Sequence, residues 1–347
     1  MDEETEPEIL IKQAISMQEL VEAGGDILNP QELEGMYNKC LEHLKKSDDR
    51  KKQCDAQIDE EEDEIEVLEV HEQDKDLENQ FHCNIAEIFG KLFQTHKEKA
   101  LPIFEQLNNM FISTSLNDTQ TDMIKKFGLF LICDSVDHLG LLIGEVKLEQ
   151  FYQYLKKYSL YPMVFVRHAA VYGLGAMSLA LGEKFKPCVS DSLNTLQKSL
   201  KVPVGTEEDE IYKATRDNTT SAIGKIIKST FNLHSQEELK LMLNEWLQLL
   251  PLKADKVEAN IQHEFLLDLI EKHQPLILNR VENLDKILKS IASIWRTKSS
   301  NDALNARMSA LLSTWNSDPV MVDAMSKITL SEKQQTWIKK ALESEQK

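Results

Sequence analysis

Cysteine is scarce in this sequence, and its spacing excludes the sites that depend on it. The five cysteines are scattered without a CxxC pair, at Cys40, Cys54, Cys83, Cys133 and Cys188. An odd and dispersed set argues against a disulfide framework or a zinc site and is typical of a reducing compartment. We therefore expect the chain to act in the cytoplasm and the nucleus.

Long hydrophobic runs are also missing. No stretch reaches the roughly 18 uninterrupted apolar residues that a membrane span needs. The start, MDEETEPEIL, is acidic and has no basic region of the kind that opens a secretory signal peptide. We expect neither membrane insertion nor a secretory signal.

A surplus of positive charge is missing as well. Residues 1–80 hold 26 acidic side chains and 8 Lys plus Arg, while residues 81–347 hold 32 of each, so the net charge of −18 lies in the first quarter. A protein that binds nucleic acid non-specifically needs excess Lys and Arg to neutralise phosphates. We expect no direct binding of nucleic acid.

Motifs that carry chemistry are absent too. The GLG at 173–175 lies within an apolar helical pattern and lacks the strand-turn-helix setting of a phosphate-binding loop. The nine histidines are dispersed, with no HExxH or other ligand spacing, and we interpret His168 as a surface or packing residue. We predict no enzyme, no catalytic residue, no cofactor and no metal site.

What the sequence does contain is a repeated helical pattern, clearest in PMVFVRHAAVYGLGAM at 162–177. Small residues fall about one turn apart there, and glycine inside a helix costs about 1 kcal/mol relative to alanine, so the glycines indicate close packing. Apolar helices aligned on a small or tightly packed position give Ala86, Ser135, Gly175, Gly224 and Leu267, separated by 49, 40, 49 and 43 residues. HEAT-type helix pairs recur at about this period.

The pattern predicts an all-α fold, an α-solenoid of about seven HEAT-type antiparallel helix pairs. We expect one solenoid over residues 1–347. Residues 302–315 and 331–346 read as helices, and we interpret the stretch at about 301–347 as an irregular capping pair.

A run of acidic residues interrupts this pattern and predicts an acidic loop at about 55–75. Self-repulsion keeps such a run from packing, so one interpretation is a solvated loop. The other is a surface that attracts a basic partner, because clustered charge raises the local concentration of the opposite sign. The partner-binding candidates are Asp59, Glu60, Glu61, Glu62, Asp63, Glu64 and Glu66.

Polar and aromatic residues inside the predicted helices are interpreted as structural. Arg167 and Asp217 occupy points where HEAT-type units can form a ladder of ion pairs, although the other units lack both residues, and the ladder is at best fragmentary. Aromatic residues at helical spacing usually belong to the core. We therefore favour packing over ligand contact for the tryptophans, which are Trp246, Trp295, Trp315 and Trp337.

Five segments in one order resemble the C-terminal part of the importin-beta (karyopherin-beta) family, nearest to the importin beta-3 branch. They are DEEEDEIEVLE (59–69), NIAEIFGKLFQTHKEKALPIFEQL (84–107), VRHAAVYGLGAM (166–177), ATRDNTTSAIGKIIK (214–228) and EWLQLLPLKADKVEANIQHEFLLDLIEKHQPLILN (245–279). The resemblance implies a non-enzymatic nuclear transport receptor. Its partners would be protein cargo with basic segments and phenylalanine-glycine nucleoporins.

The same resemblance implies weak or absent binding of the GTPase Ran. Family members are much longer, and the N-terminal repeats that carry their main Ran-binding surface have no counterpart in these residues. The alternative function is a HEAT-repeat scaffold or regulatory subunit that holds an enzyme in a complex.

The acidic run generates a first prediction. Replacing Asp59 to Glu64 with serine and asparagine should weaken binding of a Lys- and Arg-rich peptide at low salt. At physiological ionic strength exposed charges act only within a screening length of about 8 Å, so the effect should be clearest at low salt. Fluorescence anisotropy with a labelled basic peptide at two salt concentrations measures this. Unchanged affinity at low salt would remove the segment from the mechanism.

Overall fold

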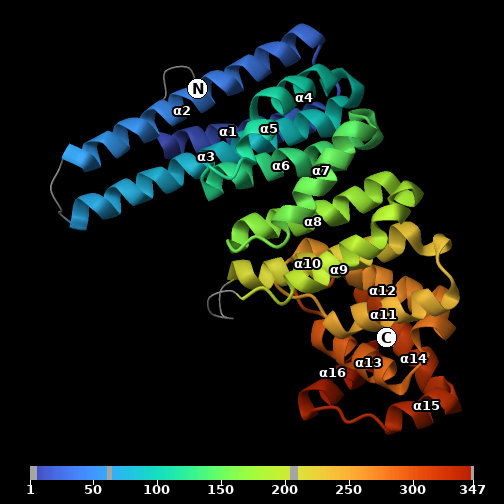
Figure 1. Cartoon of the computed structure of the whole chain (residues 1–347). Helices are drawn as coiled ribbons and strands as arrows, with labels where there is room; N and C mark the ends of the chain where they lie inside the picture. The colour runs from blue at the N-terminus through green and yellow to red at the C-terminus, as the bar shows by residue number, and fades with distance from the viewer. Residues whose placement is uncertain (1–5, 61–64, 204–209, 345–347) are drawn as a thin grey trace. The chain divides into compact units, whose positions relative to one another are not determined.

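The computed structural model describes residues 6–60, 65–203 and 210–344, and within these ranges the side chains outside 54–60 and 65–71. These residues form an all-α structure without a β-strand, and neighbouring helices pack in HEAT-like pairs, as the sequence predicts (Figure 1). The chain divides into two compact units, Met1–Leu155 and Lys156–Lys347. The boundary falls within one helix, and each unit is described by itself.

In the unit Met1–Leu155 the first helix of each pair packs against the first helix of the next pair. These are α1 (Pro7–Gly24), α3 (Ile65–His96) and α6 (Asp122–Leu139). The second helices are α2 (Pro30–Glu60), the succession α4 (Leu101–Leu107) and α5 (Ser113–Ser115), which a π-helical turn at Asn108–Ile112 joins, and α7 (Glu145–Tyr158). Aromatic rings fill the space between the layers, with Phe93, Phe104 and Phe151 in successive edge-to-face contacts.

The unit Lys156–Lys347 repeats this arrangement. Its first helices are α8 (Val164–Leu181), α10 (Glu210–Thr230), α12 (Lys256–Ile277) and α14 (Asp302–Ser317), and each packs against the next. Its second helices are α9 (Val189–Ser199), α11 (Gln236–Leu249) and α13 (Val281–Ile294), followed by α15 (Pro319–Ser326) and α16 (Glu332–Ser344). Polar side chains cap helices of both layers. Ser235 and Glu238 form a capping box on α11, and Asp255 accepts from two backbone amides of α12.

The helix α8, which carries the small-residue pattern, is the most apolar and lies in the core. Val166, Ala170, Leu174 and Met177 are each fully buried. The stretch Val164–Ser199 is long and apolar enough to cross a membrane by length and composition, but 61% of its most apolar window is buried within the protein. The core helix of a folded unit passes the same test, so this stretch is weak evidence for a membrane span.

The small residues of α8 allow a close approach of α10. A Cβ atom added at Gly175 would lie 2.9 Å from the Cα atom of Ala222 and 3.1 Å from its Cβ atom. Ala222 is buried, and it belongs to the backbone of the neighbouring first helix. The glycine is therefore required by the distance between two helix axes, as the sequence indicated.

Arg167 and Asp217 each support the fold, but through backbone groups and without an ion pair between them. The Nη1 atom of Arg167 donates to the carbonyl oxygens of Tyr161 and Pro162 at 2.6 and 3.0 Å. The Oδ2 atom of Asp217 accepts from the backbone amides of Lys253, Ala254 and Asp255 at 2.7, 2.6 and 3.1 Å. Asp217 thereby fixes the turn that leads into α12.

The tryptophans pack as predicted. Trp246, Trp295 and Trp315 are buried, and Trp337 of α16 stacks edge to face on Trp295 with ring centroids 5.9 Å apart. This contact joins the last helix to the end of α13. The connection that precedes α16 contains the short helix α15, because Asp318 caps it and Pro319 occupies its first turn.

The acidic stretch at about 55–75 is largely helical in its backbone, which corrects the expectation of a loop over that range. The helix α2 continues to Glu60 and α3 begins at Ile65, so Asp59, Glu60 and Glu66 lie within helices. Glutamate, lysine and glutamine are good helix formers, and their charge alone does not end a helix. The rest of the set, Glu61, Glu62, Asp63 and Glu64, lies outside the described residues.

The contact at Gly175 generates a stability prediction. Gly175→Val should lower the free energy of unfolding by about 2–3 kcal/mol, because the added atoms meet a backbone atom that cannot rotate away. Urea unfolding followed by circular dichroism measures the change.

Gly35 of α2 is the matched control, since a Cβ atom added there meets nothing within 4 Å. Gly35→Ala should raise the free energy of unfolding by about 0.5–1 kcal/mol through helix propensity alone. A Gly175→Val variant as stable as the parent would contradict the close-approach argument.

Candidate interaction surfaces

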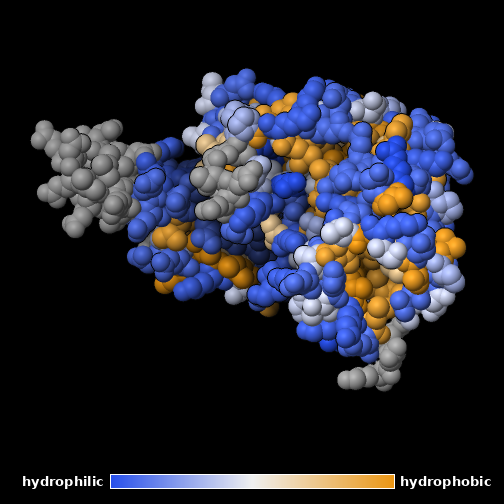
Figure 2. Space-filling model, turned by 90° about the horizontal axis from the view of Figure 1, so that it is seen from below, coloured by the Kyte–Doolittle hydropathy of each residue, from blue (hydrophilic) through white to orange (hydrophobic). Residues whose placement is uncertain are grey.

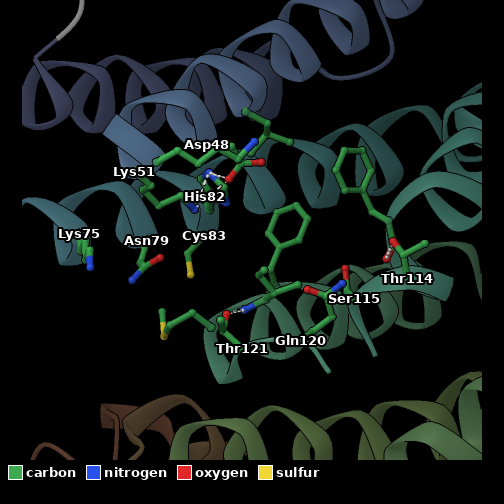
Figure 3. Close-up of a pocket in the computed structure, with 16 residues that line it drawn as sticks. Asp48, Lys51, Lys75, Asn79, His82, Cys83, Thr114, Ser115, Gln120 and Thr121 are labelled. Atoms are coloured by element: carbon green, nitrogen blue, oxygen red, sulfur yellow. Dashed lines mark hydrogen bonds and ion pairs between the residues drawn. The ribbon is translucent and has the colours of Figure 1, made fainter. Parts of the chain in front are cut away.

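A hollow of about 560 Å³ opens in the first unit among α2, α3 and the segment from α5 to α6 (Figure 3). Its α3 wall carries Lys75, Asn79 and Cys83, which are four residues apart and therefore lie on one face of the helix. Lys51 and Lys52 of α2 contribute further positive charge to its lining. The α2 and α3 side of the hollow thus carries several cationic side chains.

The opposite side of this hollow, beneath α3, combines an apolar and aromatic part with the polar residues Thr114, Ser115, Gln120 and Thr121. Phe111 and Phe127 meet edge to face with ring centroids 6.0 Å apart, and Met123 and Ile124 of α6 complete the surface. The His82 ring also lies edge to face on Phe127, at 5.9 Å. A ligand with an apolar group and a negative charge would match both sides.

Behind the cationic side lies a polar network that joins α2 to α3. The Nε2 atom of His82 is 2.8 Å from the Oγ atom of Ser47, and that hydroxyl donates to the Oε2 atom of Glu78 at 2.5 Å. Arg50 also pairs with Glu78, with its Nη2 atom 2.9 Å from Oε2. Burial first, and then the charge of Lys51, lower the pKa of His82 to about 4. The imidazole is therefore neutral near pH 7.

The neighbouring thiol is equally unreactive. Burial raises the pKa of Cys83, so the thiol stays protonated, and the thiolate is the form that acts as a nucleophile or metal ligand. Among the residues that the structure describes, no cluster of three His, Cys, Asp or Glu could hold a metal ion. The polar network beside this hollow holds α2 on α3.

A second, more apolar groove of about 510 Å³ lies in the second unit between the second helices α9 and α11. Leu193 of α9 and Leu200, which directly follows α9, line it on one side, and Met242 and Trp246 line it from α11. At its rim Gln197 donates to Glu245 across the two helices. Leu193, Leu200 and Met242 are each partly exposed, so the groove presents apolar surface to solvent.

Elsewhere the exposed surface is mainly polar. Hydrophilic residues cover most of the face in Figure 2, with hydrophobic residues in separate patches among them. Some large apolar side chains are exposed singly, such as Val146 at 86% and Leu241 at 60%. Single exposed apolar residues are normal on folded proteins, so the grooves are the more informative features.

The structure does not test the residues that the sequence proposes as a partner site. The side chains of Asp59, Glu60 and Glu66 fall in the range without described side chains, and the others lie outside the described residues. Sequence reasoning missed the hollow beside His82. Its one local signal is the polar series Lys75, Asn79 and Cys83 at four-residue spacing on a helix that is otherwise apolar toward the core.

Residues 9–118 match a family model described as Importin repeat 6. The match spans about a third of the 347 residues and extends from α1 to the connection after α5. It supports an importin-beta-family repeat region over that part of the chain. The α2 and α3 walls of the hollow beside His82 lie within the matched residues, and its α6 side lies beyond them.

The lowered pKa of His82 generates a prediction about pH. A histidine that titrates near 4 when folded and near 6.5 when unfolded binds fewer protons in the folded state, so stability falls as the pH drops from 6.5 toward 4. Between pH 6.5 and pH 5 the loss from this group should be about 1.5 kcal/mol. Hydrogen exchange of α3 amides, measured by mass spectrometry against pH, reports it.

His82→Gln should flatten this pH dependence in α3. It should leave unchanged the pH dependence of α12 in the second unit, where burial lowers the pKa of His263 to about 4 in the same way. An unaltered slope in α3 of the variant would show that other groups cause the acid sensitivity.

Proposed function

We propose that this chain is a non-enzymatic transport receptor of the importin-beta type, or the part of one that binds protein partners in import into the nucleus. The observation that carries the proposal is the match of residues 9–118 to Importin repeat 6, on helices that pack in neighbouring pairs. The chemistry of the hollow agrees with it, because His82 and Cys83 are both held in their uncharged forms. A histidine with a pKa of about 4 is a weak base near pH 7, and a protonated thiol is a poor nucleophile, so neither group is well prepared for proton or group transfer.

We assign phenylalanine-glycine nucleoporins to the apolar groove between α9 and α11. A phenylalanine ring is a flat apolar group that gains most by leaving water for a groove lined with aliphatic and aromatic side chains. Leu193, Met242 and Trp246 provide such a lining. A shallow contact of this kind is weak and is released quickly, which suits passage along a series of repeats.

We assign cargo with basic segments to the acidic residues at 59–66. The chain carries its whole net charge of −18 within residues 1–80, so a positively charged segment is attracted to that quarter from outside the range of direct contact. Both assignments entail that the protein works in the cytoplasm and the nucleus. Neither needs a cofactor.

The groove between α9 and α11 generates the test. Met242→Lys should weaken binding of a peptide with several phenylalanine-glycine repeats by about tenfold, because a charge in the groove must be desolvated when the ring enters. Isothermal titration or surface plasmon resonance with the full chain measures this affinity.

Leu241→Lys is the matched control, because Leu241 lies next to Met242 on the same helix but is 60% exposed and does not line the groove. Equal effects of the two substitutions would take the groove out of the mechanism. Failure of the parent chain to bind the peptide, together with retention of a kinase or phosphatase subunit from an extract, would favour the scaffold function.

A further inference from the structure

Cationic residues from three separate elements of the second unit lie within electrostatic range, with Arg216 and Lys253 on one hollow and Lys286 near enough to be affected by both charges. Arg216 lies on α10, Lys253 in the connection between α11 and α12, and Lys286 on α13. Arg216 and Lys253 line a hollow of about 420 Å³ whose wall includes Tyr212 and Pro251. This hollow is distinct from the apolar groove between α9 and α11.

Neighbouring positive charges act on Lys286. Burial first, and then the charges of Arg216, Lys289 and Lys253, lower the pKa of Lys286, while the neighbouring Asp285 opposes them. Within the described parts of the chain, the side chains of Arg216, Lys253 and Lys286 have no ion-pair partner of their own. Repulsion between like charges lowers the stability of the folded state. These cations are therefore not explained by the packing of the helices.

The carboxylates around these three cations are engaged elsewhere. Asp217 accepts from three backbone amides, and Asp255 caps α12 and accepts from Asn218. Glu210 pairs with Lys213 at 2.9 Å, and Asp285 pairs with Lys289 at 2.7 Å. Each of these four acids, all within the described residues, therefore has a structural partner, and the side chains of Arg216 and Lys253 are exposed.

We propose that Arg216, Lys253 and Lys286 form a docking surface for an acidic peptide segment of a partner protein. The guanidinium of Arg216 can hold a carboxylate through two parallel hydrogen bonds, and the two ammonium groups can pair with further carboxylates. Tyr212 and Pro251 offer an apolar wall for a side chain next to the acids. The surface thus selects charge opposite to that of the cargo assigned to residues 59–66.

The size of this surface favours a peptide over a nucleic acid. Nucleic-acid affinity comes mainly from many phosphate contacts, roughly 6–10 in a typical specific complex, whereas this cluster supplies three cations. A short acidic segment needs only two or three carboxylates at the right spacing. The proposal goes beyond the proposed transport function, because it involves other residues, another ligand charge and another groove.

The test compares two triple variants of the full chain that carry the same charge change. The first is Arg216→Gln, Lys253→Gln and Lys286→Gln. The second is Lys240→Gln, Lys272→Gln and Lys327→Gln, whose lysines each pair with an acid three or four residues earlier in the chain. The probe is a fluorescein-labelled peptide of twelve residues made of glutamate and aspartate with one leucine.

At physiological salt the first triple should weaken binding of this peptide by about tenfold or more relative to the parent, and the second by less than about twofold. A peptide with glutamine and asparagine in place of the acids should not bind the parent. Saturating acidic peptide should also raise the melting temperature of the parent and of the second triple, but not of the first.

Three results would overturn the proposal. The two triples could weaken binding equally, which would indicate general electrostatic attraction. A single-stranded oligonucleotide could bind the parent more tightly than the peptide and lose that binding in the first triple. The first triple could melt well below the second without peptide, which would show that the three cations serve the fold. Because the phenylalanine-glycine peptide is measured separately, failure here leaves the proposed function standing, and the reverse also holds.

Discussion

The close approach of successive first helices is the constraint on which the second unit depends. Gly175 brings α8 against Ala222 of α10, and the same face of α10 then carries a buried polar network to α12. There the Nζ atom of Lys225 lies 2.7 Å from the Oε1 atom of Glu258, and both side chains are less than a tenth exposed. A buried pair of this kind adds little net stability, but a shift of one helix along the other would separate two desolvated charges. The pair therefore fixes the register that the small residues permit.

Because the first helices pack on one another, the second helices keep apolar surface that a partner can bind. The first helices pack on one another through their apolar and small residues. The second helices α9 and α11 meet less closely and leave partly exposed leucine and methionine between them. The connection after α11 is held by Asp217 of α10. Lys253 lies in this connection, and its side chain lines the same hollow as Arg216. Packing of the first helices thus accompanies two chemically different surfaces, an apolar groove between second helices and a cationic hollow formed by α10 and the connection after α11.

Much of the fold was predictable from the sequence, because its signals are local. Hydrophobic periodicity gave the helix pairs, and glycines inside apolar helices indicated close packing at Gly175. The sequence did not predict the extent of α2 and α3. Self-repulsion of the acidic run suggests a loop, whereas the helix propensity of glutamate and lysine favours a helix. The hollow beside His82 and the cluster of Arg216, Lys253 and Lys286 depend on residues far apart in the chain, and their positions come from tertiary packing. The structural role of Arg167 was foreseen, but its carbonyl partners were not.

The placement of the tryptophans has a practical consequence. All four lie beyond residue 155, and three of them are buried in the second unit. Indole emission therefore monitors that unit alone, while the first unit contributes only tyrosine and phenylalanine. The natural sequence thus carries an indole signal in the second unit alone, and the unfolding of that unit can be followed without any dye or engineered probe.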